Sequence, residues 1–158
     1  MKISKKVSIA IHILLVTHYF ADITKITGKL LTRSTGCNPV IVRTIVSALK
    51  KAGFLGVTRG AKSSTTLIKD PEEITLRNIC EAVDPDTLNN FLKGIHSCSS
   101  PQCPIGKRIV EVLENPYQRI TEVIENAMEG ITLKTLFDGF SSKEINHHRE
   151  LIKQITRP

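Results

Sequence analysis

Apolar side chains recur at intervals of three and four residues along several stretches of the chain, which is the spacing of one face of an α-helix. The first such stripe consists of Ile3, Val7, Ala10, Ile11, Leu14 and Leu15. It predicts a helix that runs to about His18. In residues 22–26, β-branched side chains are spaced by polar ones, and we expect a short strand there.

Residues 27–51 predict two helices joined by a tight turn. Thr27 can cap a short helix over residues 29–34, and Asn38 can cap the second through its side-chain oxygen. Pro39 suits the first helical position, where no N–H donor is needed. The second helix then carries an apolar stripe of Val42, Ile45, Val46 and Leu49. Residues 35–37 form a turn of the length that a helix-turn-helix uses.

The opposite face of the second helix is polar and basic. At 100° per residue it carries Val40, Thr44, Ser47 and Lys51, with Arg43 and Lys50 on its flanks. No acidic residue occurs from Asn38 to Lys51. This face suits a polyanion, although a helical hairpin with a solvated basic face would show the same pattern.

Directly after these helices, residues 54–58 and 65–69 enclose a polar loop and predict a β-hairpin. A helix-turn-helix followed by a basic hairpin is a winged-helix arrangement, and it favours DNA over a merely solvated surface. The candidate DNA-contacting residues are Lys2, Asn38, Val40, Arg43, Thr44, Ser47, Lys50, Lys51, Arg59 and Lys62. We expect Val40, Thr44 and Ser47 to face base edges and the cations to bind phosphate or the minor groove.

Thr75 can cap a helix that ends near residue 83, in which Cys80 is expected to be a small buried hydrophobe.

Residues 84–103 read as a loop. Pro104 then opens a long helix whose stripe spans about seven turns. Its members are Ile105, Ile109, Val112, Leu113, Ile120, Val123, Ile124, Ala127 and Met128. A two-fold dimer through paired long helices is the simplest way to bury this stripe.

Pro116 lies inside the long helix and predicts a kink or a break, with Asn115 as a new cap. A short helix follows over residues 132–138. Ser141 and Glu144 then form a capping box at the start of a helical tail with Ile145, His148, Ile152 and Ile155 at helical spacing.

The expected fold is mainly α with a small β-hairpin. Residues 1–83 are the predicted winged helix-turn-helix domain, and residues 84–103 a cysteine-containing loop. Residues 104–138 hold the dimerisation helix and the short helix that follows it, and residues 139–158 the helical tail.

The composition supports a nucleic-acid partner without proving one. The 158 residues include 22 lysines and arginines against 15 acidic residues, a net charge of +7. No stretch approaches the length of a membrane span. The four cysteines are too few and too scattered for a secreted disulfide scaffold, so we expect a reducing cytoplasm. We find no catalytic constellation and do not expect an enzyme.

The cysteines leave two chemical alternatives open. His96, Cys98 and Cys103 are three ligand-type side chains, but a structural metal or iron–sulfur site normally needs four, so we expect neither. Thiol sensing is the stronger hypothesis, because the start of the long helix favours a Cys103 thiolate and Cys98 is near enough to resolve it. The alternative is that Cys98 and Cys103 are ordinary loop residues without a chemical function. Cys37 is expected only to fill its turn.

The segments CNPVIVRTIVSALKKAGF and DPEEITLRNICEAVD, with the CP-I-G start of the long helix, resemble the Rrf2 family of bacterial winged-helix transcription regulators. The resemblance covers about residues 1–138. It implies a homodimeric regulator, usually a repressor, that binds a near-palindromic operator. The family's recognition helix falls on residues 39–51 and its wing on residues 59–66.

Two departures from the family pattern matter. Ser63 and Ser64 stand in the region near the wing tip where the family usually has a pair of glycines. Only Cys98 and Cys103 stand where cluster-binding members carry three cysteines, so the chain resembles the branch without a cluster. Two other functions stay open. One is a protein-interaction module that docks a partner on the long-helix stripe, and the other is a metal or ligand sensor.

Overall fold

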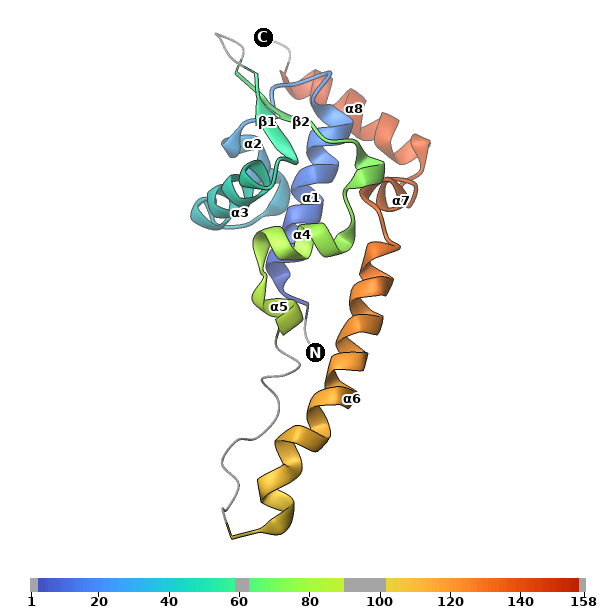
Figure 1. Ribbon diagram of the computed structural model, residues 1–158. Coiled ribbons are helices and arrows are strands. Elements are labelled where there is room, and N and C mark those ends of the chain that lie inside the picture. The colour runs from blue at the N-terminus through green and yellow to red at the C-terminus, as the bar shows by residue number, and fades with distance from the viewer. Residues whose placement is uncertain (1–2, 59–62, 90–101, 157–158) are drawn as a thin grey trace.

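The structure, a computed structural model, describes residues 3–58, 63–89 and 102–156 (Figure 1). In chain order its elements are α1 (Lys5–Phe20), α2 (Gly28–Thr35), α3 (Pro39–Lys51), β1 (Leu55–Val57), β2 (Thr65–Leu67), η1 (Pro71–Glu73), α4 (Leu76–Val83), α5 (Asp86–Asn89), α6 (Pro104–Glu129), α7 (Leu133–Phe137) and α8 (Ser142–Thr156). The predicted fold class, mainly helical with a small hairpin, is confirmed.

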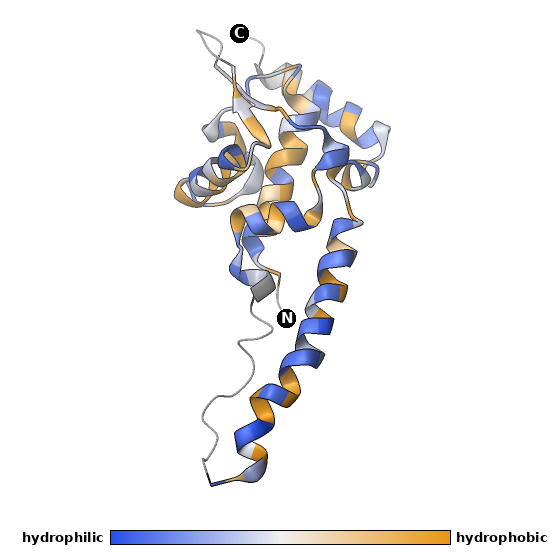
Figure 2. Ribbon diagram, in the orientation of Figure 1, coloured by the Kyte–Doolittle hydropathy of each residue, from blue (hydrophilic) through white to orange (hydrophobic). Residues whose placement is uncertain are grey.

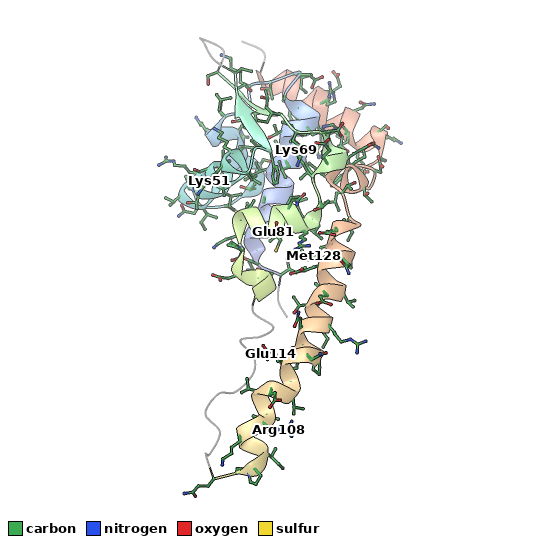
Figure 3. All side chains as sticks on the ribbon, in the orientation of Figure 1. Lys51, Lys69, Glu81, Arg108, Glu114 and Met128 are labelled. Atoms are coloured by element: carbon green, nitrogen blue, oxygen red, sulfur yellow. The ribbon has the colours of Figure 1, made fainter. Side chains whose placement is uncertain are left out.

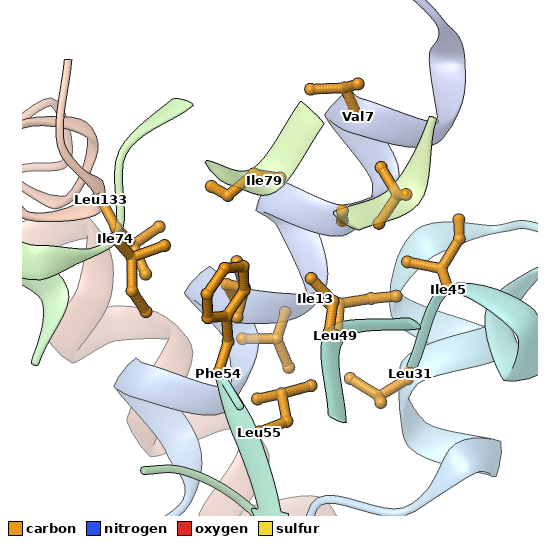
Figure 4. Close-up of a cluster of buried hydrophobic side chains, with 14 of the residues drawn as sticks. Val7, Ile13, Leu31, Ile45, Leu49, Phe54, Leu55, Ile74, Ile79 and Leu133 are labelled. Carbon is orange, nitrogen blue, oxygen red and sulfur yellow. The ribbon is translucent and has the colours of Figure 1, made fainter. Parts of the chain in front are cut away.

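Helix α1 is the centre of the winged-helix domain, because α2, α3, α4 and β2 all pack against it. It buries more of its surface than the predicted stripe implied. Ile13, Val16 and Phe20 lie in the core in addition to Val7, Ala10 and Leu14, whereas Ile3 is 45% exposed. Neighbours on several sides leave α1 with no single apolar face. Figure 4 shows Ile13 of α1 together with Leu49 of α3 in this cluster of buried side chains.

The predicted caps of the two helix-turn-helix elements are confirmed. The Thr27 side chain accepts a hydrogen bond from the amide of Leu30 at the start of α2. Asn38 Oδ1 accepts one from the amide of Val40 at 2.8 Å. Between the helices, Gly36 has φ 64°, a left-handed conformation that ends α2 without the steric strain of a side chain.

The strand predicted over residues 22–26 is wrong. After α1 the amides of Ile23 and Thr24 both donate to the carbonyl of Phe20, which makes a turn. Ile26 is 1% exposed, and its β-branched side chain packs in the core although the segment is not a strand. This segment still touches the hairpin, since the amide of Thr65 donates to the carbonyl of Ile26 at 3.0 Å.

Strands β1 and β2 pair antiparallel, with Leu55 opposite Leu67 and Val57 opposite Thr65. The turn into β1 follows Gly53, which has φ 77°. Phe54 and Leu55 are 4% and 2% exposed, so the base of the hairpin is part of the core. The hairpin tip lies outside the described residues.

Helix α4 begins with a capping box formed by Thr75 and Asn78. Cys80 on its inner face is fully buried, which confirms the prediction of a small core residue. The loop predicted from residue 84 needs a correction, because residues 86–89 form the short helix α5. The hydroxyl of Thr87 donates to Asp84 Oδ2 at 2.8 Å at the start of this helix.

Helix α6 runs from Pro104 to Glu129 without interruption. Of the kink or break predicted at Pro116, the break with Asn115 as a new cap is therefore wrong. Pro116 has no N–H to offer the carbonyl of Val112. Both residues are exposed, so water can hydrate that carbonyl and the turns on either side persist. Helix α6 projects beyond the rest of the described chain (Figure 1).

The C-terminal tail packs beside the end of α1. Its capping box is confirmed, since Ser141 Oγ accepts from the amide of Glu144 and the Glu144 carboxylate accepts from the amide of Ser141. Arg149 of α8 donates to the carbonyl of Tyr19 at 2.7 Å and pairs with Asp22. The sequence assigned this helix no role, and the structure shows that it braces the junction of α1 with the segment before α2.

Candidate DNA-binding surface

The outer face of α3 is open. Val42, Ile45 and Leu49 are at most 2% exposed and anchor the helix to the core. The candidate residues on the other side, Val40, Arg43, Thr44, Ser47 and Lys51, are all exposed, and Lys50 is half-buried. Figure 3 shows Lys51 at the α3 edge of the molecule. The structure therefore brings the predicted residues of this helix together on one accessible face.

Two of these side chains already use part of their hydrogen-bonding capacity. Asn38 Oδ1 caps α3, which leaves the side-chain NH2 group as its donor to another molecule. The hydroxyl of Thr44 donates to the carbonyl of Val40 at 3.0 Å. Its oxygen lone pairs remain available, so Thr44 can accept a hydrogen bond from a base amino group.

The cations of α3 have no acidic partner among the residues that the structure describes. In the described part of the chain, Arg43, Lys50 and Lys51 form no salt bridge, whereas Arg77, Arg108, Lys134 and Arg149 each pair with a carboxylate. An unpaired surface cation can bind a phosphate without first giving up another partner. The charge of this face is therefore available for a polyanion.

A groove of about 490 Å³ lies between α2, α3 and β2. Lys29 of α2 contributes to its lining, together with Arg43 and Lys50 of α3. Sequence reasoning did not include Lys29 among the candidates. A signal was present, because Lys29 follows the N-cap Thr27 by two residues and stands at the exposed start of α2, but only the packing of α2 on α3 brings it beside Arg43.

The opposite flank of α3 meets the start of α1. Lys6 lines a hollow of about 240 Å³ with Val40, Thr44 and Val83. A cation at a helix N-terminus opposes the helix macrodipole, so Lys6 does not stabilise α1 in this way. Its position beside the outer face of α3 places its charge where an anionic partner of that face would lie. Lys6 is thus a further candidate for contact with DNA. Lys2, Arg59 and Lys62 lie outside the described residues.

The predicted dimerisation stripe on α6 divides into two parts. Ile105, Val112, Ile120 and Val123 are 74%, 56%, 47% and 68% exposed, and Ala127 is also exposed. Ile109 is half-buried. Ile124 instead packs against the core of its own domain, as does the buried Met128. Figure 2 shows the apolar positions that recur along the projecting part of α6.

The cysteines lie in separate environments. Cys103 is exposed and caps α6, with its Sγ atom accepting from the amide of Gly106 at 3.4 Å. Burial, followed by the nearby Asp84 carboxylate, raises the pKa of the Cys80 thiol above its ordinary value. Cys37 is half-buried in the turn before α3. His96 and Cys98 lie outside the described residues.

The described residues contain no group of three or more His, Cys, Asp or Glu side chains placed to hold a metal ion. Within residues 3–58, 63–89 and 102–156 there is likewise no helix with the length and apolar character needed to cross a bilayer.

Residues 3–139 match the sequence model of the Rrf2 family, whose description is iron-dependent transcriptional regulator. The described residues offer no ligand set that fits iron. A curated relative from Bacillus subtilis, YwnA, is named as a proposed helix-turn-helix transcriptional regulator. It is 30% identical over 136 residues, which cover 86% of this chain and 97% of the relative.

Solved structures share the fold. A proposed transcriptional regulator from Lactobacillus plantarum superposes with a TM-score of 0.69 at 25% identity, over 94% of this chain and 95% of the other. The oxidised form of CymR from Staphylococcus aureus gives a TM-score of 0.65 at 18% identity, over 90% of this chain and 100% of the other. With the open basic face of α3 and the match over residues 3–139, the chain belongs to the Rrf2 family of DNA-binding transcriptional regulators.

Proposed function

We propose that this regulator acts as a cytoplasmic homodimer that binds a near-palindromic operator and represses transcription there. The observation that supports the proposal most directly is the open face of α3, on which Arg43, Lys50 and Lys51 have no salt-bridge partner within the described part of the chain. Each protomer presents one such face, so a two-fold dimer reads two half-sites related by the same symmetry.

In this proposal, α3 enters the major groove. Val40, Thr44 and Ser47 contact base edges, and the isopropyl group of Val40 suits a thymine methyl. Arg43, Lys50 and Lys51 contact phosphates on either side of the groove. Lys29 and Lys6, one on each flank of α3, extend this phosphate contact beyond the recognition helix.

The exposed stripe on α6 supports a homodimer. Ile105 and Val123 are 18 positions apart, about five helical turns, so they project from the same side of the helix. A single long helix with apolar residues exposed over this distance gains stability by pairing with a copy of itself. Repression then needs only occupancy, because a dimer bound over a promoter excludes the polymerase.

Genomic selection followed by sedimentation tests this function. Fragments of the source genome that the purified protein retains should share a near-palindromic site, and the protein should sediment as a dimer at micromolar concentration. In vitro transcription from a promoter that carries the site should fall when the protein is added. A folded monomer that enriches no common site would contradict the proposal and favour a module that docks another protein on α6.

Thiol control is a second proposal, supported by the exposed position of Cys103 at the N-cap of α6. A peroxide would accept two electrons and two protons from Cys103 and Cys98 and leave as water, with a disulfide formed between them. Peroxide should then change operator affinity at least fivefold in the wild type and leave Cys103→Ser unchanged. An equal response in both proteins would reject this control.

We also propose that the protein works without a resident iron–sulfur cluster or metal ion. The described side chains supply no ligand group of three or more for one. Anaerobically purified protein should show no absorbance near 400 nm and no stoichiometric metal by elemental analysis. A stoichiometric metal, lost together with operator binding on chelation, would instead favour a metal sensor.

A further inference from the structure

Helix α6 is joined to the winged-helix domain near its C-terminal end. The amide of Leu76 donates to the carbonyl of Ile131 at 2.8 Å, and the amide of Leu133 donates to the carbonyl of Ile74 at 2.7 Å. These bonds hold the segment that follows α6. Met128 in the last turn is 5% exposed and packs in the core. Together these contacts fix where α6 ends.

Arg77 of α4 makes a separate attachment to α6. Its Nη2 atom lies 3.2 Å from Glu125 Oε2, and its Nη1 atom donates to Glu129 Oε1. The guanidinium is a rigid, planar fork, so two carboxylates bound to it are held in a set direction. Glu125 and Glu129 lie one helical turn apart, and this pair of contacts therefore fixes the orientation of α6 against α4.

Of the two contacts with α6, the one to Glu125 is partly shielded from water, whereas the Glu129 side chain is 51% exposed. The side chains of Arg77 and Glu125 are 29% and 25% exposed, which is less than expected for a solvated surface pair. A third carboxylate, Glu81, binds Arg77 Nε at 2.9 Å from within α4 itself. Glu81 holds the guanidinium on its own helix and makes no link to α6. Figure 3 shows Glu81 and Met128 on the two sides of this junction.

The direction of α6 has a large effect at its far end. From Glu125 back to Pro104, 21 residues at about 1.5 Å each span roughly 30 Å. A rotation of about 10° at the base would move the far end by roughly 5 Å, which exceeds the spacing of about 3.4 Å between base pairs. The exposed apolar residues lie along this distal part.

From this geometry we infer that the contacts of Arg77 with Glu125 and Glu129 set the half-site spacing that the regulator accepts. The inference rests on the proposed homodimer. If the exposed stripe of α6 pairs with its copy, the seam fixes each α6, and the angle between α6 and α4 then fixes the distance between the two α3 helices. Half-site spacing in a dimeric helix-turn-helix protein follows from that distance.

Binding to a set of duplexes with altered spacing tests the inference. The duplexes carry the two selected half-sites at the selected separation and at separations changed by −1, +1 and +2 base pairs, with a single half-site as reference. We expect the wild type to prefer its own spacing at least tenfold. Arg77→Gln should lower this preference below threefold and change single half-site affinity less than twofold. Glu81→Gln, the matched control, should keep the wild-type preference.

A second variant keeps the test independent of the stability of α4. The double change Glu125→Gln and Glu129→Gln removes both partner charges from α6 and leaves Arg77 in place, and it should relax the spacing preference as Arg77→Gln does. An unchanged preference in a folded, dimeric variant would overturn the inference. So would an equal loss of affinity on every duplex, which indicates a general structural role. A wild type that binds no operator or forms no dimer would overturn the proposed function itself.

Discussion

The side-chain oxygen of Ser64 accepts a hydrogen bond from the backbone amide of Ile26 at 2.9 Å. Ser64 stands beside the hairpin tip, and Ile26 lies directly before the cap of α2. This hydrogen bond links the hairpin to the segment that leads into α2, the first helix of the helix-turn-helix. The hydroxyl of Ser64 supplies an acceptor that a glycine at this position would lack.

Ser64→Ala should destabilise the domain by about 1–3 kcal/mol, because the amide of the buried Ile26 loses its side-chain acceptor. Ser63→Ala is the matched control, since Ser63 is exposed and its change should cost less than about 0.5 kcal/mol. Urea unfolding of the two variants measures the difference. Equal stability of the two would show that the bond to Ile26 contributes nothing.

Two substitutions at Asn38 separate its capping role from any contact with DNA. Asn38→Ala removes the acceptor for the Val40 amide and should cost about 1 kcal/mol of stability. Asn38→Asp keeps the cap and adds a negative charge at the start of α3. Its stability should match the wild type while its affinity for DNA falls at least tenfold. Undiminished affinity in Asn38→Asp would place the start of α3 away from the phosphates.

Val123→Asp should dissociate the proposed homodimer. Val123 is 68% exposed in the monomer, so the fold tolerates the change, whereas a carboxylate buried at the seam would cost about 3 kcal/mol or more. The dimer dissociation constant should rise by about a hundredfold or more in analytical ultracentrifugation. Glu114→Lys, on the opposite side of α6, is the control. A dimer as tight as the wild type in Val123→Asp would exclude this stripe as the seam.

Cys80 should resist alkylation in the folded protein, because burial raises the pKa of its thiol and excludes the reagent. At pH 8, peptide mapping after iodoacetamide treatment should show Cys103 modified well before Cys80. The raised pKa favours the neutral thiol in the folded state. The Cys80 thiol therefore leaves the free energy of unfolding undiminished below about pH 8.5, the ordinary pKa of a cysteine. As the pH rises from there through the higher pKa of the folded state, the unfolded state loses its proton first and the free energy of unfolding falls. Rapid labelling of native Cys80 would contradict its buried position.

Local chemistry made much of the fold predictable. The side chains of Thr27, Asn38 and Thr75 cap helices through atoms only two or three residues away, and a sequence shows such pairs directly. The outer face of α3 was predictable for the same reason, because helical periodicity separates its buried and exposed positions.

The sequence-based predictions failed where contacts between residues far apart in the sequence determine the local structure. Ile26 resembles a strand residue in sequence, but its partners are Ser64 and Thr65, almost forty positions later. Arg77 was missed because Glu125 and Glu129 are about fifty positions away. Lys29 became a candidate only when packing placed it beside α3. Each of these relationships depends on tertiary structure, which periodicity does not encode.

The salt dependence of operator binding by Arg43→Ala tests the central claim most directly. If α3 carries phosphate contacts, each dimer loses two of them, and the slope of log affinity against log salt should fall by about 1.8. Lys143→Ala removes one cation per protomer from the start of α8, and its slope should equal that of the wild type. The account is contradicted if Arg43→Ala, and likewise Lys51→Ala, keeps both the affinity and the slope of the wild type.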